Sequence, residues 1–138
     1  MTMSSGVQSY MRELYEYPLL RPEEERSLAT AIHAGSEAAM EQLVRSNLRL
    51  VVTIALELSN RGVGVDELIA EGNVGLIHAA RKYDPDKGAK FSTYASWWIK
   101  QCMRRAISES SKVIRIPTSS LRKVRPIQHA RVKLEREL

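Results

Sequence analysis

The run FSTYASWWIKQ, residues 91–101, contains both tryptophans of the chain and its only phenylalanine. If Ser92 caps a helix that begins at Thr93, the period of 3.6 residues brings aromatic, amide and guanidinium groups to one side. That side holds Tyr94, Trp97, Trp98, Gln101, Arg104 and Arg105. Such groups stack on bases, bond to base edges and hold phosphates. The pattern therefore indicates binding of nucleic acid, and of single strands in particular.

The tryptophan pair also has a plainer explanation, since paired aromatic residues on a helix more often belong to a hydrophobic core. The opposite side of the same helix, however, already offers small apolar side chains for burial: Ala95, Ile99, Cys102 and Ala106. Basic residues flank the aromatic side: Lys87, Lys90, Lys100, Arg104, Arg105, Lys112 and Arg115. We therefore favour a surface for nucleic acid and keep the core as the alternative.

Charge is divided unequally along the chain. Residues 1–80 carry six Lys and Arg against eleven Asp and Glu, whereas residues 81–138 carry fifteen against five. The basic half suggests a polyanionic partner, and the acidic half suggests a basic surface on a second protein. Two solvated faces without partners are the alternative.

Several classes of protein are not expected. The single cysteine, Cys102, allows no intrachain disulfide and fits a reducing cytoplasm, and no signal peptide is recognisable. The longest apolar stretch, residues 48–58, is interrupted by Arg49 and Glu57 and is too short to cross a bilayer. The three histidines are far apart, so no metal site is expected. Without a nucleophile–base set, paired carboxylates or a phosphate-cradling loop, we expect no enzyme, cofactor or small-molecule substrate.

Apolar periodicity and helix-capping signals predict an all-α fold, a compact bundle of about six to seven helices. We expect helices over residues 7–15, from Pro22 to Gly35, from Ser36 to Asn47, from Leu48 to Leu58, from Asp66 to about Lys82 and from Thr93 to about Ser110. An extended segment over residues 113–117 and a last basic helix from Thr118 or Ser119, disturbed by Pro126, should follow.

The helix expected over residues 66–82 has two unusual features. Asp66 can cap it, with Leu68, Ile69, Leu76, Ile77 and Ala80 turned inward. Gly72 and Gly75 lie inside it, where each costs about 1 kcal/mol relative to Ala. Glycines at such positions usually allow another helix to approach closely, which we expect here.

Four motifs make the chain similar to a known family. FSTYASWWIKQ is followed by Ile114–Pro117, and preceded by NLRLVV at residues 47–52 and DELIAEGNVGLI at residues 66–77. Together they resemble the sigma-70 family of bacterial transcription initiation factors, over roughly Val7 to Pro126. The resemblance implies a helical bundle that binds RNA polymerase and opens promoter DNA. It also implies three parts: N-terminal helices of the first conserved region (1–35), the second-region core (36–116) and the truncated start of a third-region basic helix (117–138).

The resemblance also implies which residues contact DNA. In the family, a flipped adenine of the melted minus-ten element stacks near the residue matched by Tyr94, and the residues matched by Trp97 and Trp98 replace it against the upstream duplex. Gln101 would face the upstream paired edge. The pocket for the last flipped base would take Asn47, Leu50, Ser92 and Thr93, and phosphates would be held by Lys87, Lys90, Arg105 and Arg115. The implied DNA-binding set further includes Phe91, Arg104 and, toward the downstream strand, Met11 and Arg12.

A second surface implied by the resemblance docks on a coiled coil of the beta-prime subunit of RNA polymerase core. It consists of Arg49, Asp66, Glu67, Glu71, Asn73 and Ile77. Carboxylates on an exposed helix suit a basic partner and speed the encounter with it. The implied partners are thus polymerase core and the non-template minus-ten strand. An anti-sigma factor is a further candidate, and no membrane contact is implied.

Some residues depart from the pattern of primary sigma factors: Ala70, Ala89, Arg104, Ser119 and Arg122. They leave open the tightness of the adenine pocket, the upstream base choice, recognition of the extended motif and the choice between a primary and an alternative factor. Two other functions stay open. One is a truncated sigma-like regulator that occupies polymerase. The other is a double-strand-specific helix-turn-helix protein, which would bind duplex without strand preference and would not bind polymerase.

Overall fold

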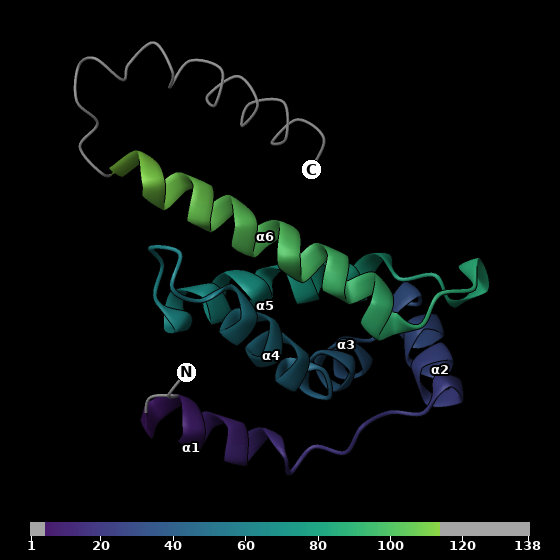
Figure 1. Ribbon diagram of the computed structural model, residues 1–138. Helices are drawn as coiled ribbons and strands as arrows, with labels where there is room; N and C mark the ends of the chain where they lie inside the picture. Colours follow the sequence, from purple (N-terminus) through teal and green to yellow (C-terminus); the bar gives the residue numbers. More distant parts are fainter. Residues whose placement is uncertain (1–4, 114–138) are drawn as a thin grey trace.

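The computed structural model describes residues 5–113, which form helices and connecting loops and contain no strand (Figure 1). The elements are α1 (Ser5–Leu14), α2 (Pro22–His33), α3 (Glu37–Arg45), α4 (Leu48–Leu58), α5 (Val65–Lys82), the short 3-10 helix η1 (Pro85–Lys87) and α6 (Phe91–Val113). The expected all-α fold is confirmed. Arg115, from the segment predicted to be extended, and the last predicted helix, with Ser119 and Arg122, lie outside the described residues.

Local signals place the first helices where the sequence predicts them. Pro22 opens α2, and the backbone N–H of Arg21 donates to Glu24 Oε1 at 3.1 Å. Gly35, with φ +97°, separates α2 from α3 in a conformation that favours glycine. Ser36 Oγ then accepts from the N–H of Ala39 at 3.1 Å and caps α3. These boundaries follow from residues that lie within four positions of each other.

The start of α5 and both ends of α6 differ from prediction, and α1 begins at Ser5 rather than at Val7. Gly64 is the N-cap of α5, so Asp66 does not cap that helix and instead lies in its first turn, where the helix dipole favours a carboxylate. Helix α6 begins at Phe91, two residues before the predicted start at Thr93, and its first turn is closed by the N–H of Tyr94 bonding to Lys90 O at 3.2 Å. Its end at Val113 also reaches into the segment predicted to be extended.

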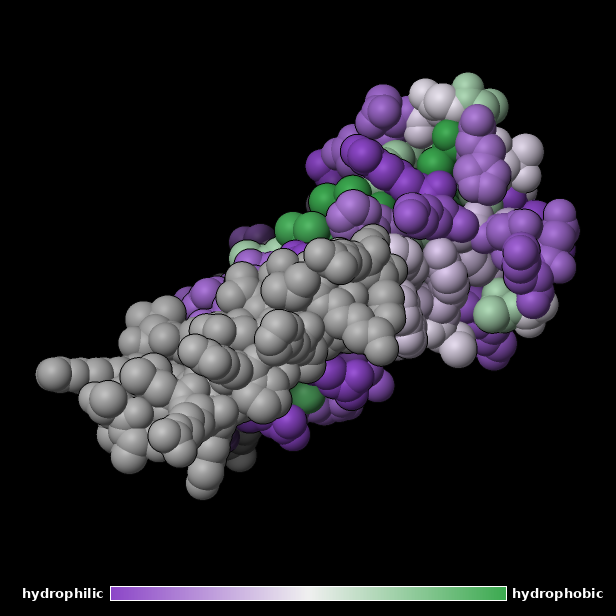
Figure 2. Space-filling model, turned by 90° about the horizontal axis from the view of Figure 1, so that it is seen from above, coloured by the Kyte–Doolittle hydropathy of each residue, from purple (hydrophilic) through white to green (hydrophobic). Residues whose placement is uncertain are grey.

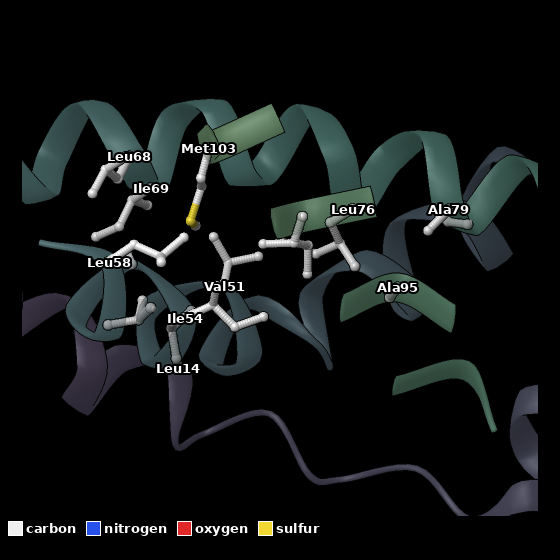
Figure 3. Close-up of a cluster of buried hydrophobic side chains, with 14 of the residues drawn as sticks. Leu14, Val51, Ile54, Leu58, Leu68, Ile69, Leu76, Ala79, Ala95 and Met103 are labelled. Atoms are coloured by element: carbon white, nitrogen blue, oxygen red, sulfur yellow. The ribbon is translucent and has the colours of Figure 1, made fainter. Parts of the chain in front are cut away.

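The hydrophobic core is built around α4, α5 and α6 (Figure 3). Helix α6 packs along α5, and α4 contacts both. The side chains of Val51, Val52 and Ala55 on α4 are fully buried, and the same cluster includes Val7 and Leu14 from α1. The core therefore joins the N-terminal helix to the helices that carry the candidate functional residues. None of α1 to α6 is long and apolar enough to span a membrane.

Two glycines let α5 come close to its neighbours, as the sequence predicts. A Cβ added to Gly75 would lie 2.6 Å from the backbone oxygen of Trp98 on α6. At Gly72 it would meet the end of the Met103 side chain and lie 2.7 Å from Cγ1 of Val51. One inward prediction is wrong: Ile77 is 37% exposed, because the buried side of α5 passes through Leu76, Ala79 and Ala80 beside it.

Candidate nucleic-acid interface

Helix α6 has the two sides that its sequence predicts. Its buried side contains Ala95, Ile99, Cys102 and Ala106, together with Met103, which was not predicted to be buried. On the other side Trp97 is 52% exposed and Arg104 is exposed, while Tyr94, Trp98, Gln101 and Arg105 are half-buried. Burial raises the pKa of the Cys102 thiol, as suits a packing residue rather than a nucleophile. The core explanation therefore does not hold for Trp97.

The two tryptophans are perpendicular to each other, with ring centroids 5.2 Å apart and an angle of 88° between the rings. Trp98 also stacks on His78 of α5, at 5.6 Å and 25°, and the Lys82 Nζ lies 5.3 Å from its ring centroid. His78 and Lys82 were not among the residues predicted to form the site. Their spacing from Gly75 could have indicated them. All three residues share one side of α5, and Gly75 was expected to face another helix.

Tyr83, at the end of α5, supports Tyr94 on the aromatic side of α6. Its side chain is buried, and its ring centroid lies 5.9 Å from that of Tyr94. Its hydroxyl donates to the backbone oxygen of Ala89 at 2.7 Å. Burial, helped by the nearby Glu25 carboxylate, raises the pKa of Tyr83, so the hydroxyl stays a donor at neutral pH. Tyr83 was not among the residues expected to form the site.

Phe91 belongs to this supporting layer and not to the surface. Its side chain is fully buried, and its ring meets Tyr83 edge-on, with centroids 5.1 Å apart and an angle of 75°. The expectation that Phe91 contacts DNA therefore does not fit this structure. The physical reason is that Phe91 begins α6 on the same side as Ala95 and Ile99, which face the core.

The loop before α6 presents Lys87 and Lys90 on the surface, both exposed. It is fixed internally by Asp84 Oδ1, which accepts from the backbone N–H of Asp86 at 2.9 Å. It is also tied to α2, because Arg26 Nη1 lies 2.7 Å from Asp86 Oδ1. In the view from above in Figure 2, the part of the surface that is coloured by hydropathy is largely hydrophilic with smaller hydrophobic areas.

The other residues of the expected DNA set lie at several places. Ser92 and Thr93 are exposed in the first turn of α6. Asn47 and Leu50 are half-buried at the start of α4, and Asn47 Nδ2 donates to Leu43 O at 2.8 Å. The structure does not bring Met11 and Arg12 beside the aromatic side of α6, because they lie on α1, which packs against α4 (Figure 1).

The acidic candidates lie along α5. Asp66 and Glu67 are exposed, Glu71 and Asn73 are half-buried, and the apolar Val74 and Ile77 are 45% and 37% exposed. The Asn73 side-chain oxygen is buried without a hydrogen-bond partner. This surface thus contains both carboxylates and exposed apolar side chains.

Arg49, the remaining residue of the expected docking set, lies on α4 and holds the segment between α1 and α2. Its Nη2 donates to Tyr17 O at 3.2 Å, and its Cζ lies 4.9 Å from the Tyr15 ring centroid. Arg45 adds a similar contact, with its Cζ 5.6 Å from the centroid of Tyr17. Among residues 5–113, no three His, Cys, Asp or Glu side chains are grouped as they would be to hold a metal ion.

By fold and surface, the chain is a small helical domain with an aromatic and basic side suited to nucleic acid and an acidic and apolar side suited to a protein. The family model of sigma-70 region 2 matches residues 43–113, and that of sigma-70 factor region 1.2 matches residues 6–38. The chain belongs to the sigma-70 family, as the sequence motifs indicate.

Similar proteins include several sigma factors. The chain is 42% identical over 135 residues to the RNA polymerase sigma factor RpoS of Coxiella burnetii, covering 98% of this chain and 38% of that protein. It is 45% identical over 132 residues to the RNA polymerase sigma factor SigA of Clostridium acetobutylicum, covering 96% and 35%. It is 44% identical over 135 residues to SigA of Lactococcus lactis subsp. cremoris, covering 96% and 37%. The chain therefore spans little more than a third of the length of these relatives.

Proposed function

We propose that this domain binds RNA polymerase core, and that it recognises and melts the promoter minus-ten element by holding its non-template single strand. The observation that carries the proposal is the row of Tyr94, Trp97 and Trp98 on α6. These rings are accessible to a ligand, although the same helix already buries a complete apolar side. Membership of the sigma-70 family supports the same function.

Base stacking supplies the energy that this proposal requires. Flipping a base out of a duplex costs a few kcal/mol, and each base–aromatic stack returns about 1–3 kcal/mol. Tyr94 and Trp98 are already held by Tyr83 and by His78, so less side-chain ordering opposes binding. Two or three such stacks would return about 2–9 kcal/mol, which offsets the flipping of one or two bases without hydrolysis of a nucleotide.

Cations around the aromatic side would hold the sugar–phosphate backbone. Lys87, Lys90 and Arg104 are exposed, and Arg105 is half-exposed. Phosphate contacts give affinity and salt dependence but no direct sequence choice. In this proposal Gln101 reads the upstream paired position, since an amide can make two hydrogen bonds to adenine.

We infer that polymerase docks on the acidic and apolar side of α5, through its beta-prime coiled coil. Asp66, Glu67 and Glu71 suit a basic partner, while Val74 and Ile77 add apolar area that remains exposed in the free domain. Arg49, which also contacts Tyr15 and Tyr17, stays in the proposed docking set. This assignment uses three of the eleven acidic residues in residues 1–80.

Strand choice tests the DNA part of the proposal. In the presence of polymerase core, the chain is expected to prefer the single-stranded non-template minus-ten element over the same duplex and over scrambled sequence. Tyr94→Ala removes a stacking surface worth roughly 1–3 kcal/mol, so the preference should fall by about 5- to 150-fold. Fluorescence anisotropy over a salt series measures both quantities.

Lys90→Ala is the matched variant for this experiment. It should weaken binding to all DNA sequences about equally. The slope of log affinity against log salt concentration should become shallower by about 0.7 per contact on a single strand. If the wild-type chain binds strand, duplex and scrambled DNA alike, the proposal is wrong and a double-strand-specific helix-turn-helix function is favoured. If only Lys90→Ala changes specificity, the roles of reading and positioning are reversed.

Charge reversal at Glu71 tests the polymerase part. Glu71→Lys should weaken binding to polymerase core by about tenfold or more, because like charges facing each other at an interface cost up to several kcal/mol. Glu57→Lys, an exposed reversal of the same charge on α4, is the control and should bind normally. Pull-down and titration with core measure the effect, and circular dichroism checks the fold. Equal binding by both variants would place the docking surface elsewhere.

A further inference from the structure

Three residues in one row on α5 contact Trp98, from its backbone to its indole ring. Gly75, His78 and Lys82 are three and four positions apart and therefore lie on one side of the helix. Gly75 brings the α5 backbone against the backbone carbonyl of Trp98, His78 stacks on its ring, and Lys82 places an ammonium group 5.3 Å from the ring centroid. Both the backbone and the indole of Trp98 are thus held by α5, along which α6 packs (Figure 1).

Trp98 in turn orients its neighbour. The Trp97 ring stands at 88° to the Trp98 ring, with centroids 5.2 Å apart, and Trp97 is 52% exposed. Because the exposed indole contacts the held one, a change in the orientation of Trp98 is passed on to Trp97. The orientation of the tryptophan surface on α6 therefore depends on residues of a second helix, α5.

We propose that His78 and Lys82 are positioning residues that hold the Trp97–Trp98 pair in its DNA-binding orientation before DNA arrives. This inference rests on the proposed function. A cation over the face of an indole is attracted by the ring, and a stacked imidazole restricts its rotation. Fixing the rings in the free protein lowers the ordering cost of binding. A plainer role for the cation is that Lys82 only complements the dipole of α5 or attracts phosphates at a distance.

Arg81 provides a matched control for this distinction. It is exposed, adjacent to Lys82 and in the same last turn of α5, so Arg81→Gln and Lys82→Gln remove the same charge from nearly the same place. Only Lys82 has its charge over the Trp98 ring. A role of charge alone predicts equal effects, and a positioning role predicts that Lys82→Gln has the larger one.

The experiment uses the whole chain, first free and then with RNA polymerase core. Near-ultraviolet circular dichroism of the free chain reports tryptophan orientation, and we expect Lys82→Gln and His78→Ala to change it while Arg81→Gln does not. With core and forked minus-ten DNA, Lys82→Gln should bind about two- to five-fold more weakly than Arg81→Gln. Lys82→Arg and His78→Phe keep the cation and the stack, so both should restore binding. In a Trp98→Leu background, the difference between the two Gln variants should disappear.

Equal near-ultraviolet spectra and equal DNA affinities for Lys82→Gln and Arg81→Gln would overturn the inference. So would a changed spectrum without any difference in DNA affinity, because the contact would then have no part in binding. Far-ultraviolet circular dichroism, with rescue by Lys82→Arg, excludes unfolding as the cause of a loss. A different result would refute the proposed function itself: no preference of the wild-type chain, with core, for the minus-ten strand.

Discussion

Replacing Phe91 with Ala is expected to lower the free energy of unfolding by about 3–5 kcal/mol, the range for truncating a large buried aromatic residue. Phe91 is fully buried and packs edge-on against Tyr83, which itself supports Tyr94. The cavity left by Ala would therefore weaken the core and loosen the tyrosine of the aromatic side. Urea unfolding, followed by far-ultraviolet circular dichroism, measures the change.

Trp97→Ala is the comparison variant, for which we expect the opposite pattern of effects on stability and DNA binding. Trp97 lies on the same helix and is 52% exposed, so its truncation should change stability by no more than about 0.5 kcal/mol and should act on DNA binding instead. Phe91→Leu, which keeps most of the apolar volume, should cost less than Phe91→Ala. A Phe91→Ala protein of normal stability but weak DNA binding would return Phe91 to the DNA-contacting set.

Gly75→Ala is expected to lower the free energy of unfolding by about 1–3 kcal/mol, the cost of overpacking a close contact. Helix propensity alone predicts the opposite sign, because Ala is favoured over Gly by about 1 kcal/mol inside a helix. The contact should prevail because the added Cβ would lie 2.6 Å from the backbone oxygen of Trp98, and backbone cannot move aside without shifting α6. Thermal and urea unfolding measure the sign.

Gly72→Ala separates backbone crowding from side-chain crowding in the same helix. The methyl group added there meets the ends of the Met103 and Val51 side chains, of which Met103 is flexible. We therefore expect Gly72→Ala to be the milder change, and only Gly75→Ala to alter the tryptophan signal in near-ultraviolet circular dichroism. A Gly75→Ala protein more stable than wild type would show that α5 and α6 are not in such close contact in solution.

Much of the fold could be predicted from local sequence signals. Pro22 and Ser36 mark the starts of α2 and α3, because proline suits a first turn and a serine hydroxyl accepts from a nearby N–H. The buried side of α6 follows from its period of 3.6 residues, and Gly75 signals a close helix neighbour before that neighbour is known. The motifs at residues 47–52, 66–77 and 91–101 were likewise enough to recognise the family.

The candidate site was predicted less completely, because periodicity assigns a residue to a side of a helix without saying what faces it. Phe91 and Tyr94 are three positions apart in one aromatic run, yet one is fully buried and the other half-exposed. Ile77 shows the same limit in reverse, since an apolar residue expected inside lies at the margin of the buried side of α5. Which aromatic residues reach the surface was therefore decided by the packing of α6 against α5.

The sequence by itself determined the helical class, most helix starts, the division of charge and the residue types available for binding bases. Only the tertiary structure decided that Tyr83 supports Tyr94, that His78 and Lys82 hold Trp98 and that Arg49 secures the segment before α2. The physical reason is range. Capping and periodicity act between residues a few positions apart, whereas these contacts join side chains from different elements, which meet only when the helices pack.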